Sequence, residues 1–418
     1  TFNIGPFMFT SARLVAPFLF ISCLKSSRSN WKFKWNTMDS LVILYFFARL
    51  FALYTTMPAD IVSKRESGAF FDLIFPYFST RLAIRSKEDA FAFLSTIVKV
   101  GAFLSFFGVY EAVTQKNPFA QAVGLDYVHD PQYLRHGLAR ASLTFGNSIA
   151  LGLFFSATTL IALGLYRIEK RKILSLIMAV LNAIGTLTTL SSAPFMALFA
   201  SIGFLAAYPL RRHWRIGVAL LLLAILVVEL ASNRHFYHVM TRFAFNTETA
   251  YYRIGLWDEA LGGGMRNHWL FGYGYVGLGP GNDNSSFKWE HQDLVNIYIF
   301  ILVRTGLCAL IPYLCINYLY FRRLYQAAGI TRSGPQRWFI WATSGALAGW
   351  NIAMMTVAPL EQIVGYLNMI AGICATLPNL VAHRPLYFRR VLKKRTQTGE
   401  PEPEQRLQIA QEATQEHE

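Results

Sequence analysis

Long apolar segments constrain this chain most strongly. Eleven segments are apolar enough, and close enough to the ~20 residues that a bilayer requires, to be read as membrane spans. They are residues 6–24, 38–57, 69–84, 90–112, 141–166, 173–190, 193–210, 216–231, 293–320, 339–357 and 361–381. Hydrophobic residues make up 54% of the chain and charged residues 15%, against ~25% charged in typical soluble proteins. The sequence therefore predicts an all-α polytopic membrane protein and excludes soluble secreted, fibrous and disordered classes.

Basic residues alternate from one connection to the next. Six connections are rich in Lys and Arg, and all six lie on one side if the eleven spans are right. The positive-inside rule makes that side the cytoplasm, and it accounts for most of the net charge of +15 without a nucleic-acid partner. The rule places the C-terminus in the cytoplasm. Residue 1 would face the opposite side, so we expect a twelfth span upstream in the native protein.

The predicted organisation is a single transmembrane domain, residues 1–395, followed by an acidic cytoplasmic tail, 396–418, without fixed structure. One large loop, about 231–292, lies on the non-cytoplasmic side and mixes aromatic residues with arginines. Within it, residues 250–261 predict a short interfacial helix that stops at Gly262–Gly264.

Glycine motifs recur in this chain, and two of them call for an interpretation. Gly272, Gly274 and Gly277 form a formal GxGxxG. The dinucleotide fingerprint requires a strand before it and a helix after it, so we interpret the motif as a turn-rich loop near the membrane. Gly345 and Gly349 form a GxxxG, which predicts close helix packing.

Several charges fall within the predicted spans or near their ends. They are Arg49, Arg81, Lys99, Glu111 and Arg304. A charge at the centre of a spanning helix costs at least ~2.5–3.5 kcal/mol. We therefore expect these residues to form pairs, reach an interface or line a wet cavity, and we expect a functional or pairing role for Arg304.

Cations also gather on the non-cytoplasmic side, where the positive-inside rule predicts few. Arg140 opens one span, Arg253 lies in the predicted loop helix, and His291 precedes another span. Such residues can simply reach lipid phosphates. Taken together they favour an anionic headgroup site, because the guanidinium fork matches two oxygens of a diphosphate. His291, kept neutral by nearby cations, would then serve as a general base.

Four stretches carry a family likeness. They are residues 140–152, which begin at Arg140; 251–261, where Arg253 precedes Trp257; the glycine-rich 269–281; and 291–306, where His291 leads into an apolar helix. In their order and spacing they resemble the superfamily of bacterial O-antigen ligases, O-antigen polymerases and protein O-oligosaccharyltransferases. The likeness implies about a dozen helices in the bacterial inner membrane and an active site on the periplasmic side.

The resemblance implies an undecaprenyl-diphosphate-linked glycan as donor. It implies that Arg140 and Arg253 bind the diphosphate and that His291 is catalytic, in an inverting transfer without a metal or cofactor. Arg242 and Arg266 are further candidates for the clamp, and Trp257, Tyr252 and Gly274 for sugar stacking or loop packing. Membrane lipids are expected partners.

The acceptor separates the alternatives. An O-antigen ligase, which uses lipid A–core oligosaccharide, is preferred over a polymerase that uses a second lipid-linked repeat. Protein O-glycosylation usually requires extra periplasmic sequence. A transporter or flippase without chemistry is the hypothesis from a different class, and it predicts charges within broken helices at the membrane midplane.

Overall fold

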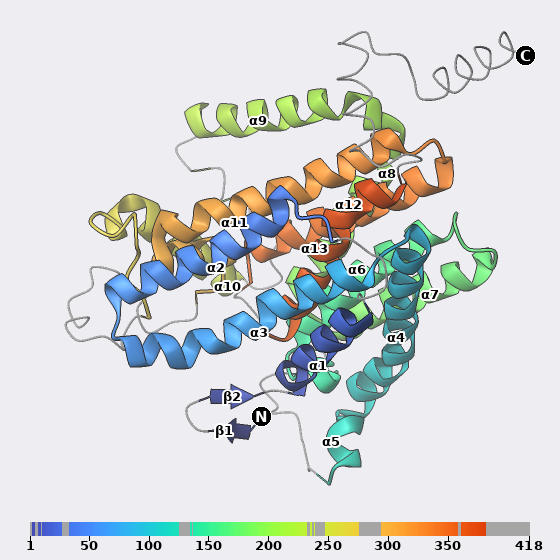
Figure 1. The fold of residues 1–418 in the computed structure, drawn as a ribbon, viewed down its shortest axis with the longest axis horizontal. Helices are drawn as coiled ribbons and strands as arrows, with labels where there is room; N and C mark the ends of the chain where they lie inside the picture. The colour runs from blue at the N-terminus through green and yellow to red at the C-terminus, as the bar shows by residue number, and fades with distance from the viewer. Residues whose placement is uncertain are drawn as a thin grey trace, which may run out of the picture.

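The chain folds almost entirely into helices in a computed structural model (Figure 1). The structure describes residues 2–4, 7–9, 11–26, 33–124, 134–135, 137–231, 235, 238, 247–275, 294–357 and 361–381. The long helices are α1 (Ser11–Ser26), α2 (Thr37–Thr56), α3 (Ala59–Ala83), α4 (Lys87–Thr114), α6 (Ser148–Leu165), α7 (Lys172–Thr188), α8 (Ser192–Ala206), α9 (Trp214–Ala231), α11 (Ile297–Ile330), α12 (Gly334–Met354) and α13 (Glu361–Val381). Each of the eleven segments predicted as spans overlaps one of these helices.

Some boundaries differ from the prediction. α3 begins at Ala59 instead of near residue 69, because the polar stretch before its apolar part is helical too. The first predicted span began at residue 6, but Phe2–Ile4 (β1) and Phe7–Phe9 (β2) pair as an antiparallel hairpin, so helix starts only at Ser11. Five described helices are long and apolar enough to cross a membrane: α2, α4, α6, α11 and α13. This agrees with a helical membrane protein, and the full count of eleven spans stays a prediction.

The centre of the fold is α6. Its most apolar stretch is 83% buried inside the protein, against 39–61% for the other four candidate spans in the described chain. Asn147 caps the helix, because its side chain accepts hydrogen bonds from the amides of Ile149 and Ala150. The helix is apolar on every face, which is the pattern of a helix surrounded by protein. It packs against α4, α7, α8 and α12.

A second group of helices carries the features described below. α2 packs against α11 and α3, and α3 packs against α13 and α1. An ion pair between Arg13 and Asp72, at 2.6 Å, ties α1 to α3. α11 also contacts α12 and α13, which joins this group to the helices around α6. α9 lies along one edge (Figure 1), and most of its described large apolar side chains are exposed.

A helix is confirmed where residues 250–261 predict one, and its interfacial position stays a prediction. α10 (Thr247–Glu259) continues into a π-helical turn, η5 (Ala260–Gly264), and leaves helical geometry at Gly263, whose φ is 128°. α10 lies beside the first half of α11 (Figure 1). Leu256 of α10 is buried in one apolar cluster with Ile299, Leu302 and Val303 of α11. We call the end of the bundle where α10 packs the loop end.

Close packing through the GxxxG pair is confirmed as well. Gly345 and Gly349 of α12 face α8. A Cβ on Gly349 would overlap Ser201 Oγ and the carbonyl of Ala197. The missing side chains therefore let the two backbones approach, as small residues do between membrane helices.

The α8–α12 contact gives the first prediction. Gly349→Ala should destabilise the protein by about 1–3 kcal/mol, the usual cost of overpacking, measured by thermal unfolding in detergent. Gly203→Ala is the matched control, because it lies on the same helix pair and a Cβ there meets nothing within 4 Å. Equal stability of the two variants would contradict this account of the packing.

Candidate functional site

A break in α11 organises the loop end. Gly306 lies inside this helix with φ 62° and ψ −166°, a conformation that no helix uses. The helical hydrogen bonds between Val303 and Leu307, and between Arg304 and Cys308, would cross this point. Residues 269–274 fill the gap instead. Tyr273 N–H donates to Val303 O (2.7 Å), Gly274 N–H to Arg304 O (3.0 Å), Leu307 N–H to Trp269 O (2.7 Å) and Cys308 N–H to Leu270 O (3.0 Å).

Two glycines make this interlock possible. Gly272 has φ 72°, and a Cβ there would lie 2.6 Å from the carbonyl carbon of Arg304. A Cβ on Gly306 would overlap the carbonyl of Leu270. Both positions combine a backbone conformation that favours glycine with an approach that only glycine allows. The described part of the GxGxxG motif is thus a loop packed on α11, and its position near the membrane stays a prediction.

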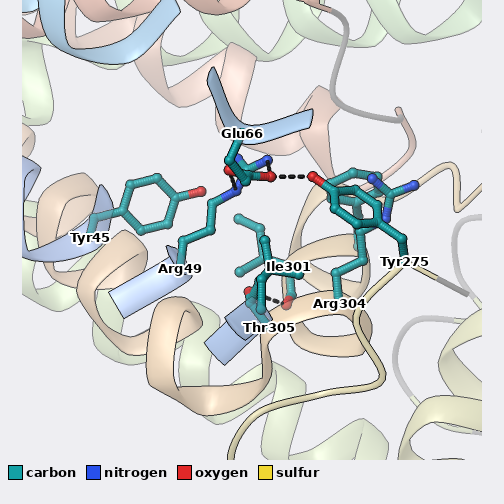
Figure 2. Close-up of a pocket in the computed structure, with 9 residues that line it drawn as sticks. Tyr45, Arg49, Glu66, Tyr275, Ile301, Arg304 and Thr305 are labelled. Carbon is teal, nitrogen blue, oxygen red and sulfur yellow. Dashed lines mark hydrogen bonds and ion pairs between the residues drawn. The ribbon is translucent and has the colours of Figure 1, made fainter. Parts of the chain in front are cut away.

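The loop end contains a small pocket, with about 10 Å³ of free space, that is partly open to solvent. Three helices and the end of the glycine-rich loop form it (Figure 2). α2 contributes Tyr45, Arg49 and Leu53; α3 contributes Glu66; the loop contributes Tyr275; and α11 contributes Phe300, Ile301, Arg304 and Thr305. Aromatic and apolar walls thus surround a small set of charged groups.

Glu66 is the centre of the polar contacts in this pocket. Its carboxylate is buried and forms two contacts with Arg49, at 2.7 Å to Nε and 2.8 Å to Nη2. The hydroxyl of Tyr275 donates a hydrogen bond to the same carboxylate. Burial and the neighbouring Glu66 raise the pKa of Tyr275 to about 12, so this hydroxyl stays protonated at neutral pH. One carboxylate thereby joins α2, α3 and the loop.

Arg304 faces the same pocket but has a different environment. Its guanidinium carbon lies 3.9 Å from the ring centroid of Phe300 and 4.9 Å from that of Tyr275. Arg65 approaches the Tyr275 ring as well, at 5.0 Å. Within the part of the chain that the structure describes, Arg304 forms no ion pair. Cation–π contacts are worth ~0.5–2 kcal/mol, which is a weak substitute for a counter-ion.

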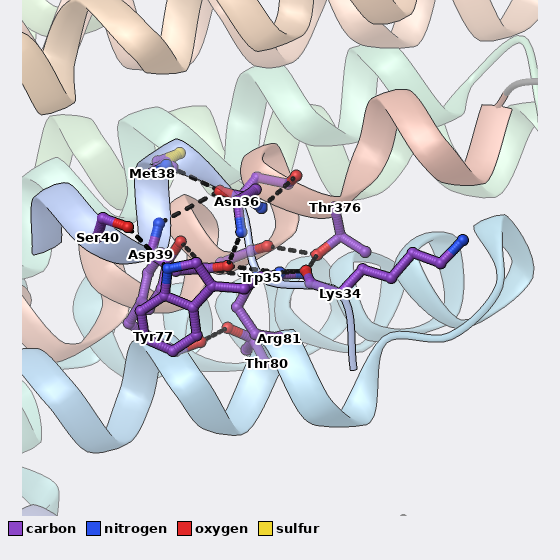
Figure 3. A network of polar contacts seen from close by, with 12 residues as sticks. Lys34, Trp35, Asn36, Met38, Asp39, Ser40, Tyr77, Thr80, Arg81 and Thr376 are labelled. Atoms are coloured by element: carbon purple, nitrogen blue, oxygen red, sulfur yellow. Dashed lines mark hydrogen bonds and ion pairs between the residues drawn. The ribbon is translucent and has the colours of Figure 1, made fainter. Parts of the chain in front are cut away.

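Arg81, in contrast to Arg304, has a carboxylate partner and further hydrogen-bond acceptors (Figure 3). It binds the carboxylate of Asp39 through Nε and Nη2, both at 2.8 Å. It also donates to the carbonyl of Lys34 and the hydroxyl of Thr376, at 2.8 and 3.1 Å. Tyr77 donates a further bond to Asp39 at 2.7 Å. This network joins α2, α3 and α13, and its role is structural.

The other predicted intramembrane charges also have identifiable environments. Glu111 is buried and accepts hydrogen bonds from the amides of Ser142 and Leu143, at 3.1 and 2.8 Å. Lys99 is exposed on α4. The expectation that such charges pair or line a cavity is therefore confirmed for Arg49, Arg81 and Arg304. The partners of Glu111 include two backbone amides and the side chains of Asn117 and Ser142.

Arg140 and Arg253 occupy different parts of the fold. The amides on either side of Arg140 donate to Ala112 O at the end of α4 and to Thr188 O at the end of α7, at 3.0 and 3.1 Å. Arg253 instead lies on α10, against α11. Because different contacts define the two positions, a shared diphosphate clamp stays a prediction.

Arg253 has an unusual environment for a cation. It is half-buried, and burial lowers its pKa from the ordinary value. Its Nε is inaccessible to solvent and has no hydrogen-bond partner among the described residues. Tyr252 and Trp257, its neighbours on α10, pack against the apolar cluster that α10 shares with α11.

The remaining predicted residues are placed only in part. Gly274 is buried where the loop meets α11, and Arg266 is exposed just after η5. His291 and Arg242 lie outside the described residues, as do Gly277 and the tail 396–418. In the described chain no group of three or more His, Cys, Asp or Glu side chains could hold a metal ion.

Sequence reasoning missed part of the pocket. Arg49 and Arg304 were recognised as costly charges, but Glu66 was not, because the polar start of α3 was assigned to a connection. Tyr275 lies within the glycine motif and was not predicted as a site residue. The pair of Arg49 and Glu66 has a signal in the sequence. A carboxylate lies about two turns into one helix, and an arginine lies about two turns before the end of the preceding helix.

The interlock at Gly306 gives a prediction. Gly306→Ala should cost about 1–3 kcal/mol in strain alone, and more because the new Cβ meets the Leu270 carbonyl. Thermal unfolding in detergent measures this loss. Gly262→Ala is the control, since a Cβ there meets nothing within 4 Å. A Gly306→Ala variant as stable as this control would mean that the break is not required.

The Arg81 network gives a second prediction at this level. Arg81→Met should destabilise the protein by about 3–5 kcal/mol, because it leaves the buried Asp39 without its cation. The effect is measured by monitoring unfolding during titration with a denaturing detergent. The double variant Arg81→Met/Asp39→Asn should recover much of the loss. If the double variant is less stable than the single one, the attribution to an uncompensated carboxylate is wrong.

Comparison with known protein families and with curated proteins finds no match to this sequence. The pocket and the interlocked loop are therefore interpreted from the residues of this chain and their contacts.

Proposed function

We propose that the protein is a membrane glycosyltransferase of the O-antigen ligase type. It transfers a glycan from undecaprenyl diphosphate to the lipid A–core oligosaccharide, at the periplasmic face of the bacterial inner membrane. The C-terminus then lies in the cytoplasm, and the loop end faces the periplasm. The alternative acceptor is a second lipid-linked repeat, which would make the protein a polymerase.

The observation that carries this proposal is the environment of Arg253. This half-buried guanidinium has no carboxylate partner in the described chain. Removing it from water costs free energy, and no ion pair offsets that cost. An anionic ligand would supply it. Arg253 lies on a helix that packs against the loop end of α11, where a lipid-linked donor can bring its headgroup to the membrane surface. A diphosphate suits guanidinium, whose fork matches two oxygens.

The proposed chemistry follows from these charges. The acceptor hydroxyl attacks the anomeric carbon of the donor glycan as the bond between that carbon and the diphosphate oxygen breaks. Inversion results, and undecaprenyl diphosphate leaves. Arg253, together with Arg140, stabilises the negative charge that gathers on the leaving group; one donor of this kind is commonly worth ~3–4 kcal/mol. His291 takes the proton from the acceptor hydroxyl.

A second candidate function has one observation in its favour. α11 is broken at Gly306, two residues after the half-buried Arg304. Broken helices that present charge inside a bundle are typical of transporters. A carrier for lipid-linked glycans would use this break to bind its cargo and would perform no chemistry. The break is held by four backbone hydrogen bonds, so such a carrier would have to move the loop and α11 together.

A reconstituted reaction tests the proposal. Purified protein is given undecaprenyl-diphosphate-linked glycan, with or without lipid A–core oligosaccharide, in EDTA throughout. We expect glycan on lipid A–core only when this acceptor is present. Arg253→Gln should lower the rate by about 100-fold or more, the usual effect of losing one charge-stabilising donor, and His291→Ala should abolish transfer while donor binding persists.

Lys99→Gln is the matched control, because it removes one exposed cation from α4, outside the proposed site. Longer lipid-linked chains without lipid A–core would identify a polymerase. Donor movement across the bilayer without any new glycosidic bond would favour the carrier.

A further inference from the structure

The end of the bundle opposite the loop end carries a cluster of aromatic rings. α11 runs from the loop end to Ile330, and α12 begins after a short connection, so we call this end the far end. Trp338 and Trp341 lie in the first turns of α12. Tyr208 opens a short 3₁₀ helix, η3 (Tyr208–His213), that follows α8. The centroid of its ring is 5.1 Å from that of Trp338 and 6.1 Å from that of Trp341.

Both indoles use their only polar group inside the protein. Nε1–H of Trp338 donates to the carbonyl of Leu163 in the last turn of α6, and Nε1–H of Trp341 donates to that of Phe204 in the last turn of α8, both at 2.8 Å. Carbonyls in the last turn of a helix have no partner within that helix, so these two bonds satisfy them and fix the rings. A tryptophan at a membrane boundary usually turns its N–H toward the wet side. In this cluster the ring faces are left for other groups.

Two arginines lie on these ring faces. The guanidinium carbon of Arg167, just after α6, is 4.2 Å from the ring centroid of Trp338, and that of Arg211, in η3, is 4.2 Å from that of Tyr208. Neither arginine forms an ion pair with a carboxylate in the described chain. Because the rings hold both cations in place, binding an anion costs less side-chain entropy than it does at mobile cations.

An apolar strip leads along α8 to the same place. Phe199, Ile202 and Ala206 are exposed at the helical spacing of one face, and the exposed Leu210 of η3 directly precedes Arg211. A surface that is apolar along a helix and cationic at its end matches a molecule with apolar chains and an anionic headgroup. The positive-inside rule predicts that the far end is cytoplasmic, where basic sites between membrane helices bind acidic lipid headgroups.

We propose that the far-end cluster, which consists of Arg167, Tyr208, Arg211, Trp338 and Trp341, is a binding site for an anionic phospholipid with two phosphates, of the diphosphatidylglycerol class. One phosphate lies against each arginine, and the rings between them set the spacing. Each guanidinium fork matches two phosphate oxygens. The acyl chains lie on the apolar strip of α8. The site is at the opposite end of the bundle from Arg253, and it does not rest on the proposed function.

Lipid binding to the purified full-length chain tests the proposal. Native mass spectrometry in detergent compares tetraoleoyl diphosphatidylglycerol with dioleoyl phosphatidylglycerol, which has one phosphate, and with neutral dioleoyl phosphatidylcholine. The two-phosphate lipid should bind about fivefold more tightly than phosphatidylglycerol, the effect of one further arginine at an anionic headgroup. Arg167→Gln and Arg211→Gln should each weaken its binding by a similar factor. The double variant should no longer distinguish the two anionic lipids.

Arg332→Gln is the matched control. Arg332 is exposed at the far end, in the connection before α12, and it lies on no aromatic ring in the described chain. This variant should bind like the wild type. An equal loss in Arg332→Gln would mean that net charge attracts the lipid, and this would overturn the proposal. So would a folded double variant that binds like the wild type, or displacement of the lipid by an equal concentration of inorganic pyrophosphate.

Thermal unfolding provides a second readout. A lipid that binds the folded chain raises its melting temperature, so diphosphatidylglycerol should stabilise the wild type more than it stabilises the double variant. Arg167 is exposed, so Arg167→Gln keeps the fold and decides alone if Arg211→Gln does not. These measurements contain no glycan donor or acceptor. A chain that transfers no glycan would therefore leave the lipid site unaffected, and loss of the lipid site would leave the proposed transferase untouched.

Discussion

A backbone group that loses its helical hydrogen bond in apolar surroundings has no water to replace the lost partner. This constraint explains the structure of the loop end. The break at Gly306 interrupts two helical hydrogen bonds of α11. Four bonds to residues 269–274 replace them. The loop is thus fixed to the helix by its main chain, and the side chains that follow inherit a defined position. Tyr275 reaches Glu66 for this reason.

Charged side chains inside the bundle also need partners, because water does not reach them. Two half-buried cations that lack an ion pair in the described chain lie at the loop end. Arg81 and Asp39 satisfy each other, with further donors and acceptors around them, and hold three helices together. Arg49 and Glu66 form a similar pair at the loop end. Arg253 and Arg304 do not have such a partner in the described chain. Since a buried cation without an anion is costly, these two positions are where an anionic ligand has most to contribute.

The two positions belong to neighbouring elements. Arg253 is one turn from Leu256, and Arg304 directly follows Val303; both apolar residues lie in the cluster that joins α10 to α11. A polyprenyl diphosphate would bring both an apolar chain and two phosphates to such a site. The transferase and the carrier share this requirement, because each must hold the donor headgroup. Only bond formation distinguishes them, and in the proposed transferase it would depend on His291 and on the acceptor.

The sequence by itself determined the helical class and the approximate position of every long helix, because apolar length is a local property. It also determined that helical geometry is lost among Gly262–Gly264 and that Gly349 marks a close contact, since both depend on what glycine lacks. Tertiary structure alone decided which charges meet. Arg49, Glu66, Tyr275 and Arg304 come from three helices and a loop, and no spacing along the chain reveals that a loop replaces the hydrogen bonds of a broken helix.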